Sequence, residues 1–265
     1  MALFRFAGYN STIMETASPF KIILFDFGST LIYSKDPWLP IYEQADRALV
    51  QVFQNSGVPL KIEAFSSEFE TFLDSYYSER GTSLIEKTTF SALQELLQEK
   101  GFQDIPASVV RTALDAMYSI TQQNWYLETD AIPTLNTLRG HGYRLGLISN
   151  TSDDKNVQQL VDRWELRPFF ETIVTSAGCG FRKPDERIYR LALDHFGVPP
   201  EQVAMVGDSL EADVLGANQL GLYSIWITRR VYLPEEGELT IQPQAVIPTL
   251  DLLPGLLADI ENATP

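Results

Sequence analysis

The hydrophobic positions near the start of the chain form one short continuous run. Residues Ile22–Phe25 are all apolar, and Pro19 before them and Gly28 after them mark the limits of the run. A short apolar run with such limits is typical of a strand that is buried on both faces, as in a parallel sheet. The run leads directly into Asp26, so the sequence predicts a carboxylate at the carboxyl end of a buried strand.

Between about residue 37 and residue 126 the apolar residues recur at helical spacing instead. Phe65, Phe69 and Leu73, for example, share one face of a helix. A glycine follows the first three segments closely, as is typical of helix C-termini. No buried strand is expected in this part of the chain. The predicted helices are 38–54, 62–79 (ending before Gly81), 87–100 and 107–124.

From about residue 131 the pattern alternates between strand-like runs and helical segments. The predicted strands are 143–149, 172–176, 203–206, 223–227 and 245–247. The predicted helices are 132–139, 154–164, 184–196 (with Pro184 in its first turn), 211–220 and 250–260. Such alternation indicates an α/β fold with a doubly wound parallel sheet. The helical block of about 90 residues is then an insertion after the first strand.

Composition and charge restrict the partners of the chain. The 265 residues carry a net charge of −15, which argues against nucleic acids and anionic membranes as partners. Cys179 is the single cysteine, so neither an intrachain disulfide nor a cysteine-based metal site is expected. No apolar run approaches the roughly 20 residues that span a bilayer. Residues 1–18 lack the apolar region of a secretory signal and are expected to form a loose tail. We therefore expect a cytoplasmic protein, whose oligomeric state the sequence does not indicate.

Polar residues stand where the predicted strands end. The carboxyl ends of parallel strands meet at one edge of a sheet, which is where such sheets bind their ligands. Each of these residues has an ordinary structural explanation, such as an acidic residue that begins a helix, but their ordered occurrence favours a shared site. The candidates are Asp26 after the first strand, Ser149 and Asn150 after the second, Lys183 in a loop, and Asp208 and Asp213 after the fourth.

These residue types permit one specific kind of chemistry. Asp26 can act as a carboxylate nucleophile. Asp208, with help from Asp213 and from Asp26 itself, can hold a hard cation such as Mg²⁺ through oxygen ligands. Lys183 supplies a second positive charge, and Ser149 supplies a hydrogen-bond donor for phosphoryl oxygens. The set therefore indicates chemistry on a phosphate group.

The stretch Asp26–Thr30, Ser149-Asn150, Lys183-Pro184 and Gly207-Asp208 with Asp213 together resemble the motifs of the haloacid dehalogenase-like (HAD) hydrolase superfamily. The resemblance covers about residues 20–261, and the helical insertion resembles that of the subfamily with a helical C1 cap. It implies a Rossmann-like core formed by residues 19–34 and 127–265 and a four-helix cap formed by residues 35–126. It also implies a Mg²⁺-dependent phosphatase that acts on a small phosphorylated metabolite through an aspartyl-phosphate.

The resemblance also implies a role for each motif residue. Asp26 is the expected nucleophile and a metal ligand, and Asp208 is a direct metal ligand. Asp213 supports the metal site or holds Lys183. The phosphoryl group is expected to be bound and oriented by Ser149, Asn150 and Lys183.

One position departs from the family pattern. Phosphatases of this family usually carry a second aspartate two residues after the nucleophile, as a general acid and base, and this chain has Gly28 there. The Gly28 carbonyl can still bind metal and substrate, but the lost side chain removes help worth about 10²–10⁴ in rate. The sequence leaves three interpretations open. The first is a phosphatase with a substitute acid or a substrate that needs none.

The second interpretation is another chemistry on the same fold. Dehalogenases of the family lack that aspartate but work without metal, which the acidic pair after the fourth strand disfavours. Phosphonatases need a cap lysine for a Schiff base, and the candidates are Lys35, Lys61, Lys87 and Lys100. The third interpretation is a catalytically weak or inactive protein that binds a phosphorylated ligand or a partner.

Overall fold

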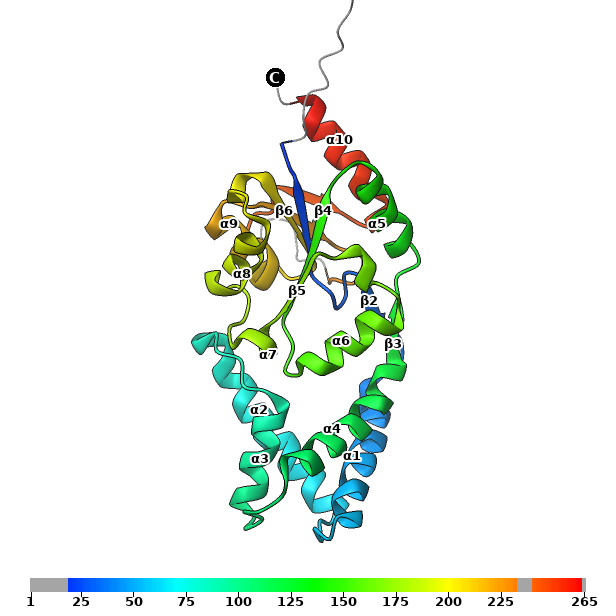
Figure 1. Ribbon diagram of the computed structural model, residues 1–265, viewed down its shortest axis with the longest axis vertical. Coiled ribbons are helices and arrows are strands. Elements are labelled where there is room, and N and C mark those ends of the chain that lie inside the picture. Colours follow the sequence, from blue (N-terminus) through cyan, green and yellow to red (C-terminus); the bar gives the residue numbers. More distant parts are fainter. Residues whose placement is uncertain (1–18, 233–239, 264–265) are drawn as a thin grey trace, which may run out of the picture.

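Six parallel strands form the central sheet of the structure, a computed structural model that describes residues 19–232 and 240–263 (Figure 1). All five neighbouring pairs within the sheet are parallel. The predicted tail, residues 1–18, lies outside the described residues. In hydrogen-bonding order the strands are β5 (Thr172–Thr175), β4 (Arg144–Ser149), β1 (Ile22–Phe25), β6 (Val203–Gly207), β7 (Tyr223–Ile227) and β8 (Ala245–Ile247).

Helices cover both faces of this sheet, because successive side chains of a strand point to opposite sides. In β1, Ile23 and Phe25 belong to one apolar cluster, while Ile22 and Leu24 belong to another. The first cluster is completed by α5 (Ala131–Gly140), α6 (Asp154–Arg163) and α10 (Leu253–Ala263). The second is completed by α8 (Glu186–Phe196) and α9 (Gly216–Leu220). The predicted doubly wound α/β fold is thereby confirmed.

The helical insertion forms a separate body below the carboxyl edge of the sheet (Figure 1). Its helices enclose an apolar core of their own, which includes Leu49, Phe53 and Leu114. In the described part of the chain, no helix is both long and apolar enough to cross a membrane. The helices of this body are α1 (Trp38–Asn55), α2 (Ile62–Ser83), α3 (Thr89–Glu99) and α4 (Ala107–Thr121).

A short antiparallel ribbon connects the two bodies. Its strands, β2 (Ile32–Ser34) and β3 (Trp125–Leu127), pair Tyr33 with Tyr126 and carry the chain out of the sheet region and back. No strand was expected at these positions. Each strand has only three residues, which is too few to show a period-2 pattern in the sequence.

Several boundaries also differ from those expected. Helix α2 continues through Gly81 to Ser83, since one glycine inside a helix costs only about 1 kcal/mol; Leu84, with a φ of 54°, follows its end. Pro184 precedes α8 instead of opening it, because Asp185 caps that helix by accepting a hydrogen bond from the Arg187 amide. The expected helix 211–220 is divided into a π-helical turn, η4, and α9. The short helices are α7 (Ser176–Cys179), η1 (Gln122–Asn124), η2 (Arg167–Phe169), η3 (Pro200–Gln202), η4 (Leu210–Leu215) and η5 (Leu250–Leu252).

Candidate active site

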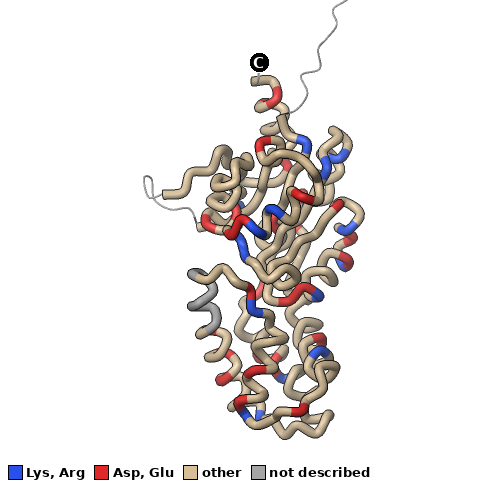
Figure 2. The backbone as a smooth tube through the Cα atoms, turned by 60° about the vertical axis from the view of Figure 1, so that its left-hand side comes forward, with Lys and Arg blue, Asp and Glu red and all other residues tan. Residues whose placement is uncertain are grey.

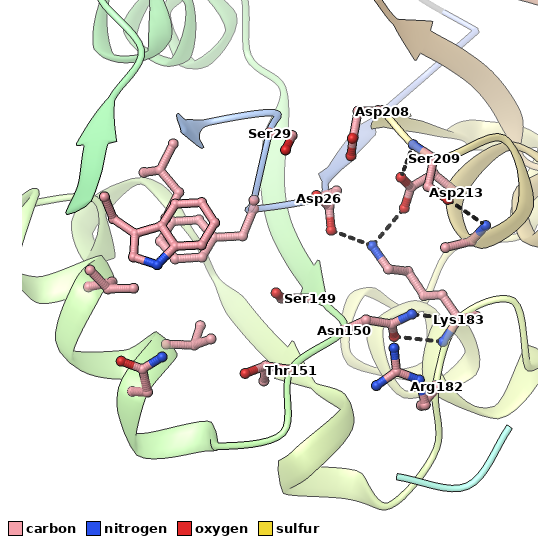
Figure 3. Close-up of a pocket in the computed structure, with 18 residues that line it drawn as sticks. Asp26, Ser29, Ser149, Asn150, Thr151, Arg182, Lys183, Asp208, Ser209 and Asp213 are labelled. Carbon is pink, nitrogen blue, oxygen red and sulfur yellow. Dashed lines mark hydrogen bonds and ion pairs between the residues drawn. The ribbon is translucent and has the colours of Figure 1, made fainter. Parts of the chain in front are cut away.

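A cavity of about 380 Å³ lies at the carboxyl edge of the sheet, and all seven residues proposed from the sequence line it (Figure 3). Six of them lie at or after the ends of β1, β4 and β6, which all meet at this edge, and Lys183 lies in the loop between α7 and α8. The seven residues are Asp26, Gly28, Ser149, Asn150, Lys183, Asp208 and Asp213.

Lys183 is the cation at the base of this cavity. Its side chain is 1% exposed, and Nζ donates hydrogen bonds to Asp26 Oδ1 at 2.6 Å, Asp213 Oδ1 at 2.6 Å and the Ile148 carbonyl at 2.8 Å. An ammonium group has three donors, so these partners use all of them. Burial alone would lower the pKa of Lys183, but Asp213 and Asp26 raise it above its ordinary value. Lys183 is therefore charged, and it fixes the two carboxylates relative to each other.

Asp213 reaches Lys183 because of the turn that carries it. Residue Ser209 caps η4 by accepting a hydrogen bond from the Ala212 amide, and its own amide donates to Asp213 Oδ2 at 2.9 Å. A side chain at Gly207 would collide with this carboxylate, since a Cβ there would lie 2.2 Å from Asp213 Cγ. The absence of a side chain at Gly207 thus permits the buried position of Asp213.

Asn150 was expected to contact substrate, and in the structure its side-chain amide is bonded to the backbone of Lys183. Its Oδ1 accepts from the Lys183 amide at 2.8 Å, and its Nδ2 donates to the Lys183 carbonyl at 3.0 Å. Both ends of the amide are thereby satisfied within the protein. The geometry makes Asn150 a residue that positions the Lys183 loop against the end of β4.

The three carboxylates of the cavity lie close enough together to share one cation. Asp26, Asp208 and Asp213 can each offer an oxygen atom, and these atoms lie within 4.8 Å of one another. Burial raises the pKa of Asp26 to about 6, although Lys183 opposes the rise and Asp213 adds to it. Burial, together with Asp26 and Asp213, raises the pKa of Asp208 to about 7. A cluster of three carboxylates beside one ammonium has excess negative charge and fits a hard divalent cation.

The helical body reaches the cavity through the segment 84–86. This segment lies antiparallel to residues 180–182, with the Glu86 amide donating to the Gly180 carbonyl at 2.9 Å and the Arg182 amide donating to the Leu84 carbonyl at 2.9 Å. The Glu86 carboxylate is buried; it pairs with the Arg182 guanidinium and accepts a hydrogen bond from Ser176 at 2.7 Å. Arg182 itself lines the cavity, next to Lys183.

A second set of polar contacts joins the helical body to the N-terminus of α6. Arg111 Nη1 lies 2.6 Å from Asp153 Oδ2, and Lys155 Nζ lies 2.7 Å from Asp115 Oδ2. Charged residues of both signs gather where the two bodies meet (Figure 2). The amide of Thr89 also donates to the Ser152 carbonyl at 2.8 Å. These contacts hold the helical body over the cavity in this structure.

Comparison with known proteins identifies the family. Residues 20–221 match the family model described as haloacid dehalogenase-like hydrolase. The chain belongs to this family. A curated relative, the glyceraldehyde 3-phosphate phosphatase of Methanothermobacter thermautotrophicus, is 32% identical over 213 residues, which cover 78% of this chain and 85% of the relative. The predicted enzyme class, a HAD-like hydrolase, is thus confirmed.

Solved structures of HAD proteins share the fold. A 2-haloacid dehalogenase from Pseudomonas syringae pv. Tomato DC3000 is similar with a TM-score of 0.64 and 22% identity, covering 91% of this chain and 99% of that one. A HAD phosphatase from Thermococcus onnurineus is similar with a TM-score of 0.60 and 23% identity, covering 89% and 97%. At these identities the likeness concerns the fold alone.

Some residues at the HAD cavity were not expected from the sequence. The apolar part of the lining, called the apolar wall below, consists of Trp125, Ile32, Val157 and Leu160, and Arg182 adds a second cation. The adjacency of Arg182 to Lys183 was a usable signal. No signal in the sequence indicated the position of Trp125, because that position depends on how the ribbon between the two bodies folds.

Proposed function

We propose that this HAD-like hydrolase is a Mg²⁺-dependent phosphatase that acts on a small phosphorylated metabolite through an aspartyl-phosphate formed on Asp26. The observation that carries the proposal is the position of the Asp26 carboxylate. It lines the cavity, one of its oxygens is bonded to Lys183, and it lies within one cluster with two further carboxylates. The relative named as a glyceraldehyde 3-phosphate phosphatase supports a small phosphate ester as substrate.

Each residue of the cluster has a distinct part in this proposal. The Asp26 oxygen that does not contact Lys183 bonds to phosphorus while Lys183 holds Oδ1, which fixes the direction of attack. Ser149, at the end of β4, offers its hydroxyl to the phosphoryl oxygens. Lys183, whose three donors are engaged, contributes positive charge and order.

The acidic cluster is the proposed site for Mg²⁺. Asp26, Asp208 and the Gly28 carbonyl would hold the ion directly, and Asp213, which already binds Lys183, would support the site. When bound, the ion supplies positive charge that offsets the repulsion between a carboxylate nucleophile and a phosphate dianion. The excess of carboxylates over ammonium groups in this cavity supports the assignment.

We further propose that residues 35–126 act as a cap over a core made of residues 19–34 and 127–265. The separate apolar core of α1–α4 and the two-stranded ribbon at both junctions support this division. A cap in this place would exclude water from the reacting groups and select the substrate.

The alternative chemistries find less support in the described residues. Among the described lysines, Lys183 is the one that lines the cavity, whereas Lys87 pairs with Glu95 and Lys100 pairs with Glu68. A phosphonatase would need one of the cap lysines at the substrate. A dehalogenase of this family would need no metal, so a cluster of three carboxylates that fits a cation supports that chemistry less.

The test is phosphate release from p-nitrophenyl phosphate by the native protein and by Asp26→Asn, with Mg²⁺ and with a chelator. The substitution keeps the size of the side chain and removes the nucleophile. A matched control is Asp259→Asn, which changes an exposed aspartate on α10, away from the cavity. We expect Mg²⁺-dependent release from the native protein and from Asp259→Asn, and a loss of at least about 10³-fold in Asp26→Asn.

Two results would contradict the proposal. Equal turnover by Asp26→Asn would remove Asp26 from the chemistry. Absence of turnover in the native protein, together with tight binding of inorganic phosphate, would favour a protein that binds a phosphorylated ligand and does not hydrolyse it.

A further inference from the structure

The indole of Trp125 occupies the space beside Gly28. A Cβ built on Gly28 would lie 3.8 Å from Trp125 Cη2, which is ordinary van der Waals contact. Gly28 itself lies two residues beyond the proposed nucleophile. The six-membered ring of the Trp125 indole therefore lies beside the position from which a side chain at residue 28 would project.

Apolar side chains lie in the same part of the cavity lining as this indole, and a second tryptophan packs against it. Ile32, Val157 and Leu160 line the cavity with it. The ring of Trp38 packs against Trp125 with a centroid separation of 5.5 Å and an interplanar angle of 55°. Such contacts between aromatic rings hold the indole in place, and Trp125 still lines the cavity.

The polar groups of the described cavity lie mainly on the opposite side, at the sheet edge (Figure 3). The carboxyl groups of its lining are those of the acidic cluster, and the Arg182 guanidinium is paired with Glu86. Asn156, next to the apolar wall, accepts a hydrogen bond from Gln122 at 3.0 Å. In-line attack by Asp26 expels the leaving oxygen on the side of phosphorus opposite to the nucleophile, and Trp125 lines this same cavity beside Gly28.

We infer that Trp125 is a platform for the leaving group, and that the preferred substrates are phosphate monoesters of phenols or of similarly planar, acidic hydroxyl compounds. This inference rests on the proposed phosphatase function and narrows its substrate class. A flat aromatic group matches an indole face. A phenol, with a pKa of about 10 as in tyrosine, leaves as an anion far more readily than an alkyl alcohol. Gly28 has no side chain with which to protonate it.

The reaction is balanced without a proton donor at position 28. An oxygen of Asp26 bonds to phosphorus, the bond from phosphorus to the aryl oxygen breaks, and the electron pair leaves with the aryloxide, which takes a proton from solvent. Water then attacks phosphorus and the bond to Asp26 breaks; one proton of the water stays on hydrogen phosphate, and the other returns to solvent and replaces the proton taken by the aryloxide. The products are a phenol and hydrogen phosphate, with Asp26 restored.

The first test measures binding and requires no turnover. Phenylphosphonate and methylphosphonate carry the same phosphorus group and differ in the aromatic ring. Calorimetry in the presence of Mg²⁺ compares them on the native protein, Trp125→Phe and Trp125→Leu. We expect the native protein and Trp125→Phe to bind phenylphosphonate about tenfold more tightly than methylphosphonate. In Trp125→Leu this ratio of the two dissociation constants is expected to fall by about two- to tenfold. Trp164→Leu, a half-buried tryptophan outside the cavity, is the matched control and keeps the preference.

The second test uses kcat/KM for phenyl phosphate and glyceraldehyde 3-phosphate. In the native protein we expect kcat/KM for phenyl phosphate to exceed that for glyceraldehyde 3-phosphate by at least about 10²-fold. Gly28→Asp is expected to lower this ratio of kcat/KM values, because it supplies a general acid. An equal or higher kcat/KM for glyceraldehyde 3-phosphate would overturn the inference. So would equal binding of the two phosphonates while Mg²⁺-dependent turnover persists, in which case the phosphatase proposal stands. Failure of both phosphonates to bind and of all esters to react would overturn the phosphatase proposal and this inference with it.

Discussion

Replacement of Lys183 by methionine is expected to destabilise the protein by about 3–5 kcal/mol at pH 8, the usual cost of removing one partner from a buried ion pair. Lys183 Nζ lies 2.6 Å from both Asp26 Oδ1 and Asp213 Oδ1, and its side chain is 1% exposed. Methionine is similar in length and apolar, so the loss comes mainly from charge. The two carboxylates then face each other in a buried site without a cation.

The loss of stability in Lys183→Met is expected to depend on pH, and the raised pKa of Asp26 determines the direction of this dependence. Its pKa, raised by burial to about 6 in the native protein, rises further once Lys183 is removed. A group whose pKa is higher in the folded state favours folding at low pH, and this contribution is lost as the pH rises through the folded-state value. The destabilisation by Lys183→Met is therefore largest at pH 8 and smaller at pH 5, where Asp26 is protonated.

The assay is unfolding in urea, monitored by tryptophan fluorescence in the presence of a chelator at pH 5, 6, 7 and 8. At each pH the free energy of unfolding of the variant is compared with that of the native protein. The double variant Lys183→Met/Asp213→Asn removes one of the two facing carboxylates. It is expected to be more stable at pH 8 than the sum of the single variants predicts, with a coupling of at least about 1 kcal/mol. A loss below about 1 kcal/mol that is equal at all four pH values, or strict additivity of the two substitutions, would refute the reasoning.

Three further predictions concern the same cavity. The increase in Tm on addition of Mg²⁺ is expected to grow between pH 5 and pH 8, because carboxyl groups with pKa values of about 6 and about 7 must lose protons to bind it; a pH-independent increase in calorimetry would contradict this. Asn150→Ala removes two hydrogen bonds to the Lys183 backbone and is expected to lower the free energy of unfolding in urea by about 1–3 kcal/mol, measured beside Asn150→Asp as the comparison variant. Unchanged stability of Asn150→Ala would be incompatible with its role in positioning the Lys183 loop. Gly207→Ala places a methyl group against Asp213 and is expected to cost about 1–3 kcal/mol and to lower kcat/KM, whereas Gly255→Ala, with open space around it, leaves kcat/KM unchanged; an equal kcat/KM in the two variants would argue against the crowding.

The parts of the site that follow from topology were predictable from the sequence. Asp26, Ser149 and Asp208 each come directly after or at the end of a strand, and a parallel sheet brings such ends to one edge. That argument needs only the strand pattern, which short continuous apolar runs show clearly. It therefore applied equally well to residues more than 100 positions apart.

The rest of the site depends on contacts that leave no pattern in the sequence. The position of Trp125 is set by a ribbon of three-residue strands, and the pairing of Arg182 with Glu86 is set by how the helical body docks. The family resemblance led us to expect that Asn150 binds the phosphoryl group, but it could not foresee that the Lys183 backbone lies within reach of both ends of its amide. Strand pattern indicates where a residue stands and does not indicate its partners.

The pairing of segment 84–86 with residues 180–182 has a consequence for how substrate enters the cavity and product leaves it. The helical body is covalently tied to the sheet region at its ribbon, and this second attachment lies directly beside Lys183. Separation of segment 84–86 from residues 180–182 would break two backbone hydrogen bonds and the buried Glu86–Arg182 pair, and a movement that keeps the two segments joined would take the Lys183 loop with it. In the cap proposed above, exchange of reactant for product is therefore coupled to the order of the charged cluster, and we expect opening to be a slow step of each cycle.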